Sequence, residues 1–173
     1  MHLAFDTYYS EIGAFTVAVA FEDWLSEKPS KVYTELLSEV APYEPGAFYK
    51  RELPCILSLL QSISVTQIDT IIVDGYVILD EERAYGLGGY LFKTLEEKVP
   101  VIGVAKSPYK NPHPYMRELF RGNSQRPLFI SSLGIPLAHA THLVGQMHGD
   151  FRMPTLLQIL DTTTKQWVKK QKD

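Results

Sequence analysis

The hydrophobic residues of this chain gather in short runs whose spacing changes along the sequence. Near the start, three runs rich in apolar and aromatic residues, at 2–9, 12–21 and 31–40, follow one another through short connections. Runs of this kind predict β-strands, and short connections join strands that run antiparallel. We therefore expect the chain to begin with an antiparallel meander of three strands.

The rest of the chain alternates helical patterns with short runs that are almost entirely apolar. Leu53, Ile56, Leu57, Leu60 and Ile63 recur at helical spacing and predict a helix over 53–63. Further helices are expected within 84–98, after its glycines, and over 136–148 and 155–170, and buried strands over 69–75, 99–106 and 126–131. This order predicts an α/β fold with a mixed sheet, in which the meander forms an edge on a parallel core.

One connection, from Ser107 to Arg126, is too long and too rich in proline for a simple loop, and such segments often carry function. Basic and aromatic residues alternate along it and in the residue before it: Lys106, Tyr109, Lys110, Tyr115, Arg117, Phe120, Arg121 and Arg126, with Glu118 as the one acid. This mixture predicts a surface that follows phosphates and stacks on bases. An ordinary solvated loop is the alternative.

Composition narrows the class of protein. The chain has 173 residues, 45% of them hydrophobic, and a net charge of −3, so we expect one domain over residues 1–173 with a substantial core. Its single cysteine excludes an internal disulfide. No stretch is long and apolar enough to span a bilayer, and the first residues lack the basic segment of a signal peptide. We expect a cytoplasmic protein with no membrane partner.

Charged residues stand where the predicted strands lie in the core or end. Asp6 sits among apolar residues of the first strand, where a carboxylate is costly unless it is paired or binds a metal. Asp74 and Lys106 each end an apolar strand, and ligands of open α/β sheets bind at the carboxyl ends of strands. These three residues are therefore candidates for a shared site.

Two further acids lie on predicted helices. Glu52 comes shortly before a proline, at an expected helix start or kink, and Asp161 borders the apolar stripe of the last helix. If these acids meet Asp6 and Asp74, their mutual repulsion favours a divalent cation such as Mg²⁺ or Mn²⁺. Such an ion supports cleavage of phosphodiesters. The alternative is that each acid is an ordinary helix cap or salt-bridge partner.

Seven short motifs make the chain similar to a known family. They are FDTYY, PYEPGAFYKRELP, IIVDG, YGLGGYL, VIGVAKS, RPLFISSLG and RMPTLLQILD. Their order and approximate spacing, from Leu3 to about Lys165, resemble the endonuclease V family. The resemblance implies a ribonuclease H-like fold of three layers, with helices on both faces of a mixed sheet. It also implies cleavage of DNA or RNA near inosine, one bond beyond the lesion on the 3′ side.

The resemblance also implies a site. Its metal-binding acids fall on Asp6, Glu52, Asp74 and Asp161, its cofactor is Mg²⁺ with Mn²⁺ as a substitute, and Lys106 completes the catalytic set. Tyr43 falls on a wedge that fills the gap left by a flipped base, and neighbouring prolines would hold it stiffly. The expected nucleic-acid contacts are Pro42, Tyr43, Pro45, Gly46, Gly75 and Tyr76, to which the basic segment adds Arg117 and Arg121. The expected partner is DNA or RNA with deaminated or unpaired bases, bound by a monomer.

Several residues depart from the family pattern. Glu44 stands where the wedge has an apolar residue, Tyr76 replaces a frequent histidine, and Val77 replaces a glycine that shapes the base pocket. Because Asp6 lies so near the start of the sequence, we expect the family's usual helix before the first strand to be absent. Because Val77 would narrow the pocket, we expect weak preference for inosine. These departures leave open a non-catalytic nucleic-acid-binding relative, or a ribonuclease H-like nuclease with another substrate.

Overall fold

The computed structural model describes residues 1–40, 42 and 44–170. The chain begins with β1 (His2–Ser10), β2 (Gly13–Phe21) and β3 (Lys31–Leu37). β1 pairs antiparallel with β2, and β2 pairs antiparallel with β3. All nine residues of β2 are buried because it lies between two strands and under helices on both faces. The predicted meander is confirmed.

The meander continues into a mixed sheet. β4 (Thr70–Asp74) runs parallel to β1, and β5 (Val101–Ala105) runs parallel to β4. β7 (Leu128–Leu133) and β6 (Arg117–Leu119) follow as antiparallel strands. In the described residues the sheet therefore has seven strands in the order β3-β2-β1-β4-β5-β7-β6. The mixed sheet agrees with the sequence, whereas β6 lies in a segment that was expected to be a loop.

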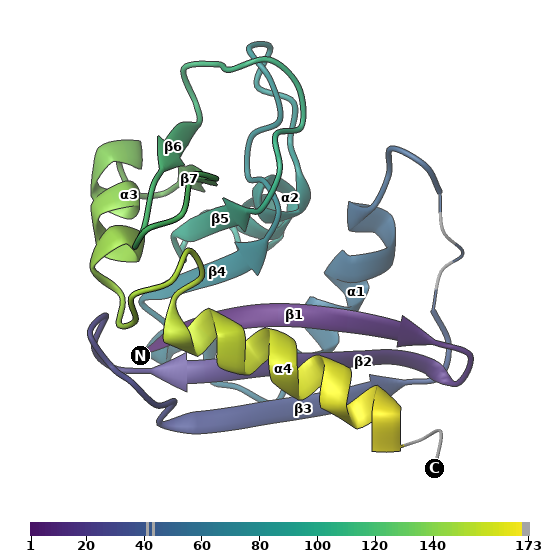
Figure 1. The fold of residues 1–173 in the computed structure, drawn as a ribbon. Helices are drawn as coiled ribbons and strands as arrows, with labels where there is room; N and C mark the ends of the chain where they lie inside the picture. Colours follow the sequence, from purple (N-terminus) through teal and green to yellow (C-terminus); the bar gives the residue numbers. More distant parts are fainter. Residues whose placement is uncertain (41, 43, 171–173) are drawn as a thin grey trace.

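Helices cover both faces of this sheet (Figure 1). The helices are α1 (Tyr49–Leu60), α2 (Leu87–Thr94), α3 (Leu137–Gln146) and α4 (Thr155–Lys170), with a short 3₁₀ helix, η1, at Val65–Gln67. Phe5 and Ile71 share one core with α1 and α2, and Ala4 and Ile72 share the other core with α3 and α4. Adjacent strand residues thus face opposite cores, which gives the predicted three layers.

Helix α1 begins earlier than the sequence pattern indicated. It starts at Tyr49 rather than at Leu53, and Pro54 lies inside it. The ring of Tyr49 stacks on Tyr90 of α2, with ring centroids 3.7 Å apart. This contact holds the first turn of α1, and Glu52 lies in that turn.

The glycines of α2 allow close packing on the loop after β4. A Cβ atom at Gly88 would lie 2.7 Å from Cγ2 of Val77. Val77 is fully buried in the core that α1 and α2 cover. The prediction that Val77 narrows a base pocket is therefore wrong, because its side chain points into the core and fills space that the α2 glycines leave.

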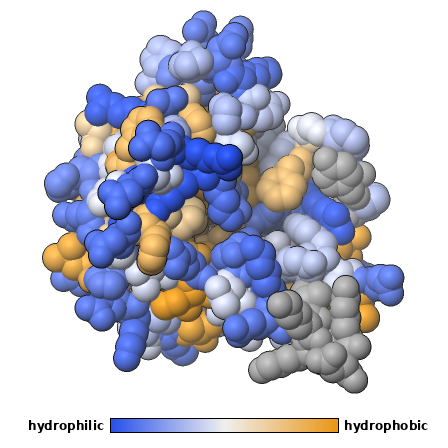
Figure 2. Space-filling view, viewed as in Figure 1, coloured by the Kyte–Doolittle hydropathy of each residue, from blue (hydrophilic) through white to orange (hydrophobic). Residues whose placement is uncertain are grey.

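The surface on the face shown in Figure 2 is mixed, with hydrophobic residues in small separate patches among hydrophilic ones. Across the described part of the chain, no helix combines the length and apolar character that crossing a membrane requires.

Candidate metal and nucleic-acid site

The centre of the site is the point where two parallel strands diverge. The pairing of β1 with β4 ends at Phe5 and Val73, so Asp6 and Asp74 are the next residues of the two strands. β1 continues beside β2 to Ser10, whereas the chain after Asp74 turns away at Gly75, with a φ of +114° that favours glycine. The two carboxylates therefore lie where the pairing of the two parallel strands ends. The sequence predicted such a position for Asp74, whereas it placed Asp6 only within its strand.

Helix α4 closes this point from one face. The hydroxyl of Thr164 donates a hydrogen bond to Asp6 Oδ2 at 2.7 Å. Asp161 lies one turn earlier on α4, and its Oδ1 atom is 3.5 Å from the Nζ atom of Lys106. The same Nζ atom is 3.7 Å from Asp74 Oδ2. An inner cavity between α4 and the strand ends is lined by Asp6, Asp74, Lys106 and Asp161 together with apolar core residues.

Helix α1 adds Glu52 from the other face. Only 2% of Glu52 is exposed, and it lines an open cleft of about 470 Å³ that also includes Asp6, Asp74 and Lys106. Burial raises the pKa of Glu52 well above its usual range, and the carboxylates of Asp6 and Asp74 raise it further. Burial also raises the pKa of Asp74, despite the opposing effect of Lys106.

The five predicted catalytic residues therefore line two adjoining cavities. The carboxylate oxygens are hard ligands of the kind that Mg²⁺ and Mn²⁺ prefer. Burial raises the pKa of Glu52, and so does repulsion by Asp6 and Asp74, which a cation would relieve. In this respect the donor set fits a divalent ion. Within the described ranges, however, no three acidic, histidine or cysteine side chains are grouped closely enough to form a ready-made metal centre.

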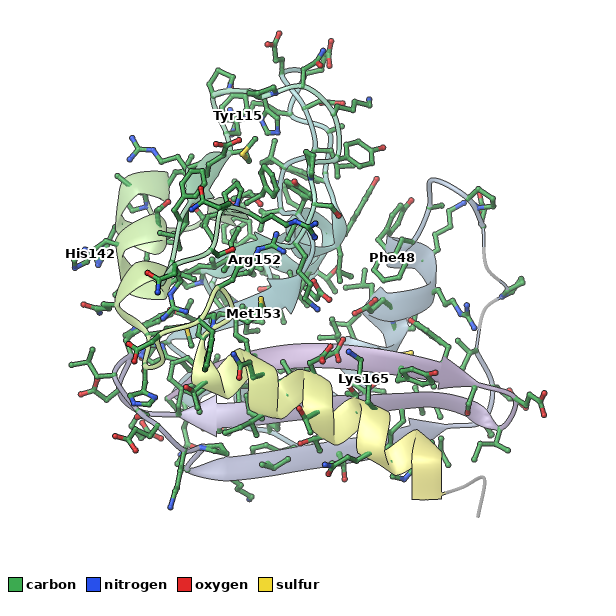
Figure 3. All side chains as sticks on the ribbon, viewed as in Figure 1. Phe48, Tyr115, His142, Arg152, Met153 and Lys165 are labelled. Carbon is green, nitrogen blue, oxygen red and sulfur yellow. The ribbon has the colours of Figure 1, made fainter. Side chains whose placement is uncertain are left out.

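Three residues that sequence reasoning missed support this arrangement. Thr164 and Lys165 lie three and four residues after Asp161, a spacing that places side chains on one helix face and that could have indicated them. The guanidinium of Arg152 donates to the backbone oxygens of Lys106 and Pro127, the latter at 2.6 Å. Arg152 thus fixes the segment that carries Lys106 (Figure 3).

Aromatic residues form the outer part of the cleft. Phe48, just before α1, is 46% exposed, and Tyr109, after β5, is 48% exposed. Tyr76 is mostly buried, and its hydroxyl donates to the backbone oxygen of Ser107 at 2.9 Å. Tyr76 and Gly75 line the cleft together with the exposed rings of Phe48 and Tyr109.

The described residues next to the predicted wedge do not line these cavities. Tyr43 is outside the described residues. Pro42, Pro45 and Gly46 are exposed and do not belong to the described residues that line either cavity. Glu44 is neutralised by Lys50, whose Nζ atom lies 2.8 Å from its carboxylate.

The two arginines of the basic segment that were expected to contact nucleic acid differ in burial. Arg117 is exposed on β6. Arg121 is only 6% exposed and donates to the backbone oxygens of Phe151 at 2.7 Å and Gly149 at 3.0 Å, and also to that of Met147. The prediction that Arg121 binds nucleic acid is therefore corrected: its donors are already used to hold the segment before α4.

Comparison with known proteins places this geometry in context. The family model for endonuclease V matches residues 3–125, a range that includes Asp6, Glu52, Asp74 and Lys106 but not Asp161. No curated protein matches the chain.

Solved structures are similar over nearly the whole chain. Human ENDOV is 21% identical, with a TM-score of 0.79 over 99% of this chain and 85% of that one. Endonuclease V from Streptomyces avermitilis is 22% identical, with a TM-score of 0.74 over 99% and 82%. Ciona intestinalis endonuclease V, in complex with a DNA that contains an inosine, is 18% identical, with a TM-score of 0.78 over 97% and 85%. These similarities confirm the predicted ribonuclease H-like fold.

Proposed function

The chain belongs to the endonuclease V family, and from this membership we propose that it is a metal-dependent endonuclease that cuts DNA or RNA on the 3′ side of a deaminated purine. The observation that carries the proposal is that β1, β4, α1 and α4 direct four acids, and β5 one lysine, toward two adjoining cavities. Mg²⁺ is the proposed cofactor, with Mn²⁺ as a substitute.

The acids and the lysine have different roles in this proposal. Asp6, Glu52 and Asp74 would hold the ion, which when bound would neutralise charge on a phosphate and activate water. The hydrogen bond from Thr164 orients the carboxylate of Asp6. Lys106, which lies between Asp74 and Asp161, can stabilise negative charge that develops on the phosphate.

Nucleic acid is the proposed partner. The exposed rings of Phe48 and Tyr109 at the cleft can stack on bases, and the exposed Arg117 can meet a phosphate. The structural similarity to an endonuclease V bound to inosine-containing DNA supports this partner. The role of Tyr43 as a wedge stays a prediction.

A nucleic-acid-binding protein that does not cut is the second candidate. The ion pairs of Asp161 favour this candidate. Asp161 Oδ2 lies 2.6 Å from Lys165 Nζ, and Asp161 Oδ1 lies 3.5 Å from Lys106 Nζ. An acid that is already paired with two ammonium groups is a poorer metal ligand than a free one.

The test is cleavage of matched oligonucleotides of DNA and RNA that carry inosine or adenine at one position, with Mg²⁺, Mn²⁺ or EDTA. We expect cutting with either metal, and Asp74→Asn should abolish it while leaving binding largely intact. Asp23→Asn is the matched control, because Asp23 is exposed and the amide oxygen can still accept the hydrogen bond from the Leu25 N–H.

Two results would change the conclusion. If the parent protein binds these oligonucleotides but cuts none of them with either metal, the second candidate is correct. If Asp74→Asn cuts as fast as the parent, the acids at the strand ends are not the catalytic site.

A further inference from the structure

Asp161 differs from the other acids of the site in having lysines on both of its oxygens. Lys165 follows it by one turn of α4, and its Nζ atom lies 2.6 Å from Asp161 Oδ2. Lys106 approaches the other oxygen at 3.5 Å. Figure 3 shows Lys165 on α4 beside β1, on the side of the helix that faces the strand carrying Asp6.

The site is therefore divided electrostatically. Burial raises the pKa of Asp161, but its contacts with Lys165 and Lys106 outweigh this effect and the pKa lies below its usual range. The pKa values of Glu52 and Asp74 are instead raised. The hydrogen bond with Asp161, and then the negative charges of Asp161, Asp6 and Asp74, raise the pKa of Lys165.

We propose that Lys165 is an internal counter-ion that occupies Asp161 and competes with a divalent cation for this carboxylate. This inference rests on the proposed metal site. It gives Lys165, which lies outside the family motifs, control over whether Asp161 is available to the metal. Asp6, Glu52 and Asp74 would hold the ion, and Asp161 would be available as a further ligand only when its pair with Lys165 opens.

The pair is able to open because it is not locked in the core. The side chains of Lys165 and Asp161 are 59% and 33% exposed, and exposed ion pairs of this kind are weak. Lys165 is therefore expected to tune metal affinity rather than to block it. Removing its charge should strengthen metal binding, because it frees Oδ2 of Asp161 and leaves the cluster more negative.

The experiment is calorimetric titration of the metal-free protein with Mn²⁺ alone. Lys165→Met should lower the Kd for Mn²⁺ by about three- to tenfold, since an exposed ion pair and a nearby unit charge each shift a constant by a few-fold. Lys165→Arg, which keeps the charge, should resemble the parent. Lys93→Met is the matched control, because Lys93, in the last turn of α2, forms an exposed pair with Glu97 four residues later. The Kd of this variant should not change.

The same substitution in an Asp161→Asn protein distinguishes competition for Asp161 from general electrostatic repulsion between Lys165 and the metal ion. If Lys165 acts through Asp161, Lys165→Met should change the Kd much less in an Asp161→Asn protein than in the parent. An equal effect in both backgrounds would overturn the competition.

Thermal unfolding supplies a readout that does not depend on activity. In EDTA, Lys165→Met should unfold at a lower temperature than the parent, and Mg²⁺ should raise its Tm by more than it raises that of the parent. If the parent binds Mn²⁺ and Lys165→Met has the same Kd, this inference fails and the proposed function stands. If neither protein binds Mn²⁺, the proposed metal site and this inference both fail.

Discussion

Replacing Arg121 with methionine should destabilise the fold rather than weaken nucleic-acid binding. The guanidinium group donates to the backbone oxygens of Met147, Gly149 and Phe151, which lie between α3 and α4. Methionine has a similar length but no donor. The substitution would leave these three oxygens without their partner in a region where Arg121 is only 6% exposed.

The expected magnitude follows from these contacts. A hydrogen bond to a charged group contributes about 1.5–3 kcal/mol, so three such bonds would together contribute about 5–9 kcal/mol. Burial also penalises the charged guanidinium, and returning it to water recovers several kcal/mol. We therefore expect the free energy of unfolding to fall by about 3–4 kcal/mol, which for a chain of this size lowers Tm by roughly 6–16 °C.

The assay is urea denaturation of the metal-free protein, with Arg117→Met as the matched control. Arg117 is exposed on β6, so its replacement should change stability by less than about 0.5 kcal/mol. If Arg121→Met is as stable as the parent, and if it also reduces the salt dependence of DNA binding, then Arg121 is a surface contact and the structural explanation is wrong.

Three further outcomes test other parts of the molecule. Because burial and neighbouring acids raise the pKa of Glu52, the folded protein binds more protons than the unfolded chain above about pH 4.5. The free energy of unfolding, measured by urea denaturation in EDTA, should therefore fall as the pH rises above about 4.5. Mg²⁺ should make this dependence on pH weaker. A free energy of unfolding that rises with pH would contradict the burial of Glu52 beside other acids. Val77→Gly should cost about 2–4 kcal/mol in unfolding free energy, because it empties a core position, and should leave the ratio of inosine to adenine cleavage unchanged. Arg117→Gln should reduce the slope of log K against log salt by about one if this residue contacts a phosphate, and an unchanged slope would show that β6 faces away from the nucleic acid.

Most strands of this fold could be predicted from the sequence because a strand that is buried along its length appears as a short apolar run. β2, β4 and β5 are buried along nearly their whole length, and each appears in the sequence as an apolar run. β6 could not be found in this way, because two of its three residues are exposed and it exists only by pairing with β7. The start of α1 was also missed, because a tertiary contact between Tyr49 and Tyr90 determines it.

The role of a site residue could be predicted when it follows from the residue's place in a strand. It could not be predicted when it depends on contacts with residues far along the chain. Asp74 could be placed at the site because it ends an apolar strand, and Asp6 was a candidate because a carboxylate inside a core strand is costly unless it is paired or binds a metal. Arg121 could not be interpreted correctly, since sequence reveals its charge but not the carbonyl groups 26 to 30 residues later that surround it. Val77 was misplaced for a similar reason, because the direction of its side chain depends on packing against α2.

The hydrogen bond between Asp6 and Thr164 joins residues 158 positions apart, and this span determines when the site can exist during protein synthesis. A ribosome makes β1, β4 and β5 well before it reaches α4. Until then the cavity lacks Asp161, and Asp6 lacks the hydroxyl that orients it. A nascent chain therefore carries an incomplete acidic set until α4 is made, and a product truncated before Asp161 would lack Asp161, Thr164 and most of the helix that packs on β1 and β2.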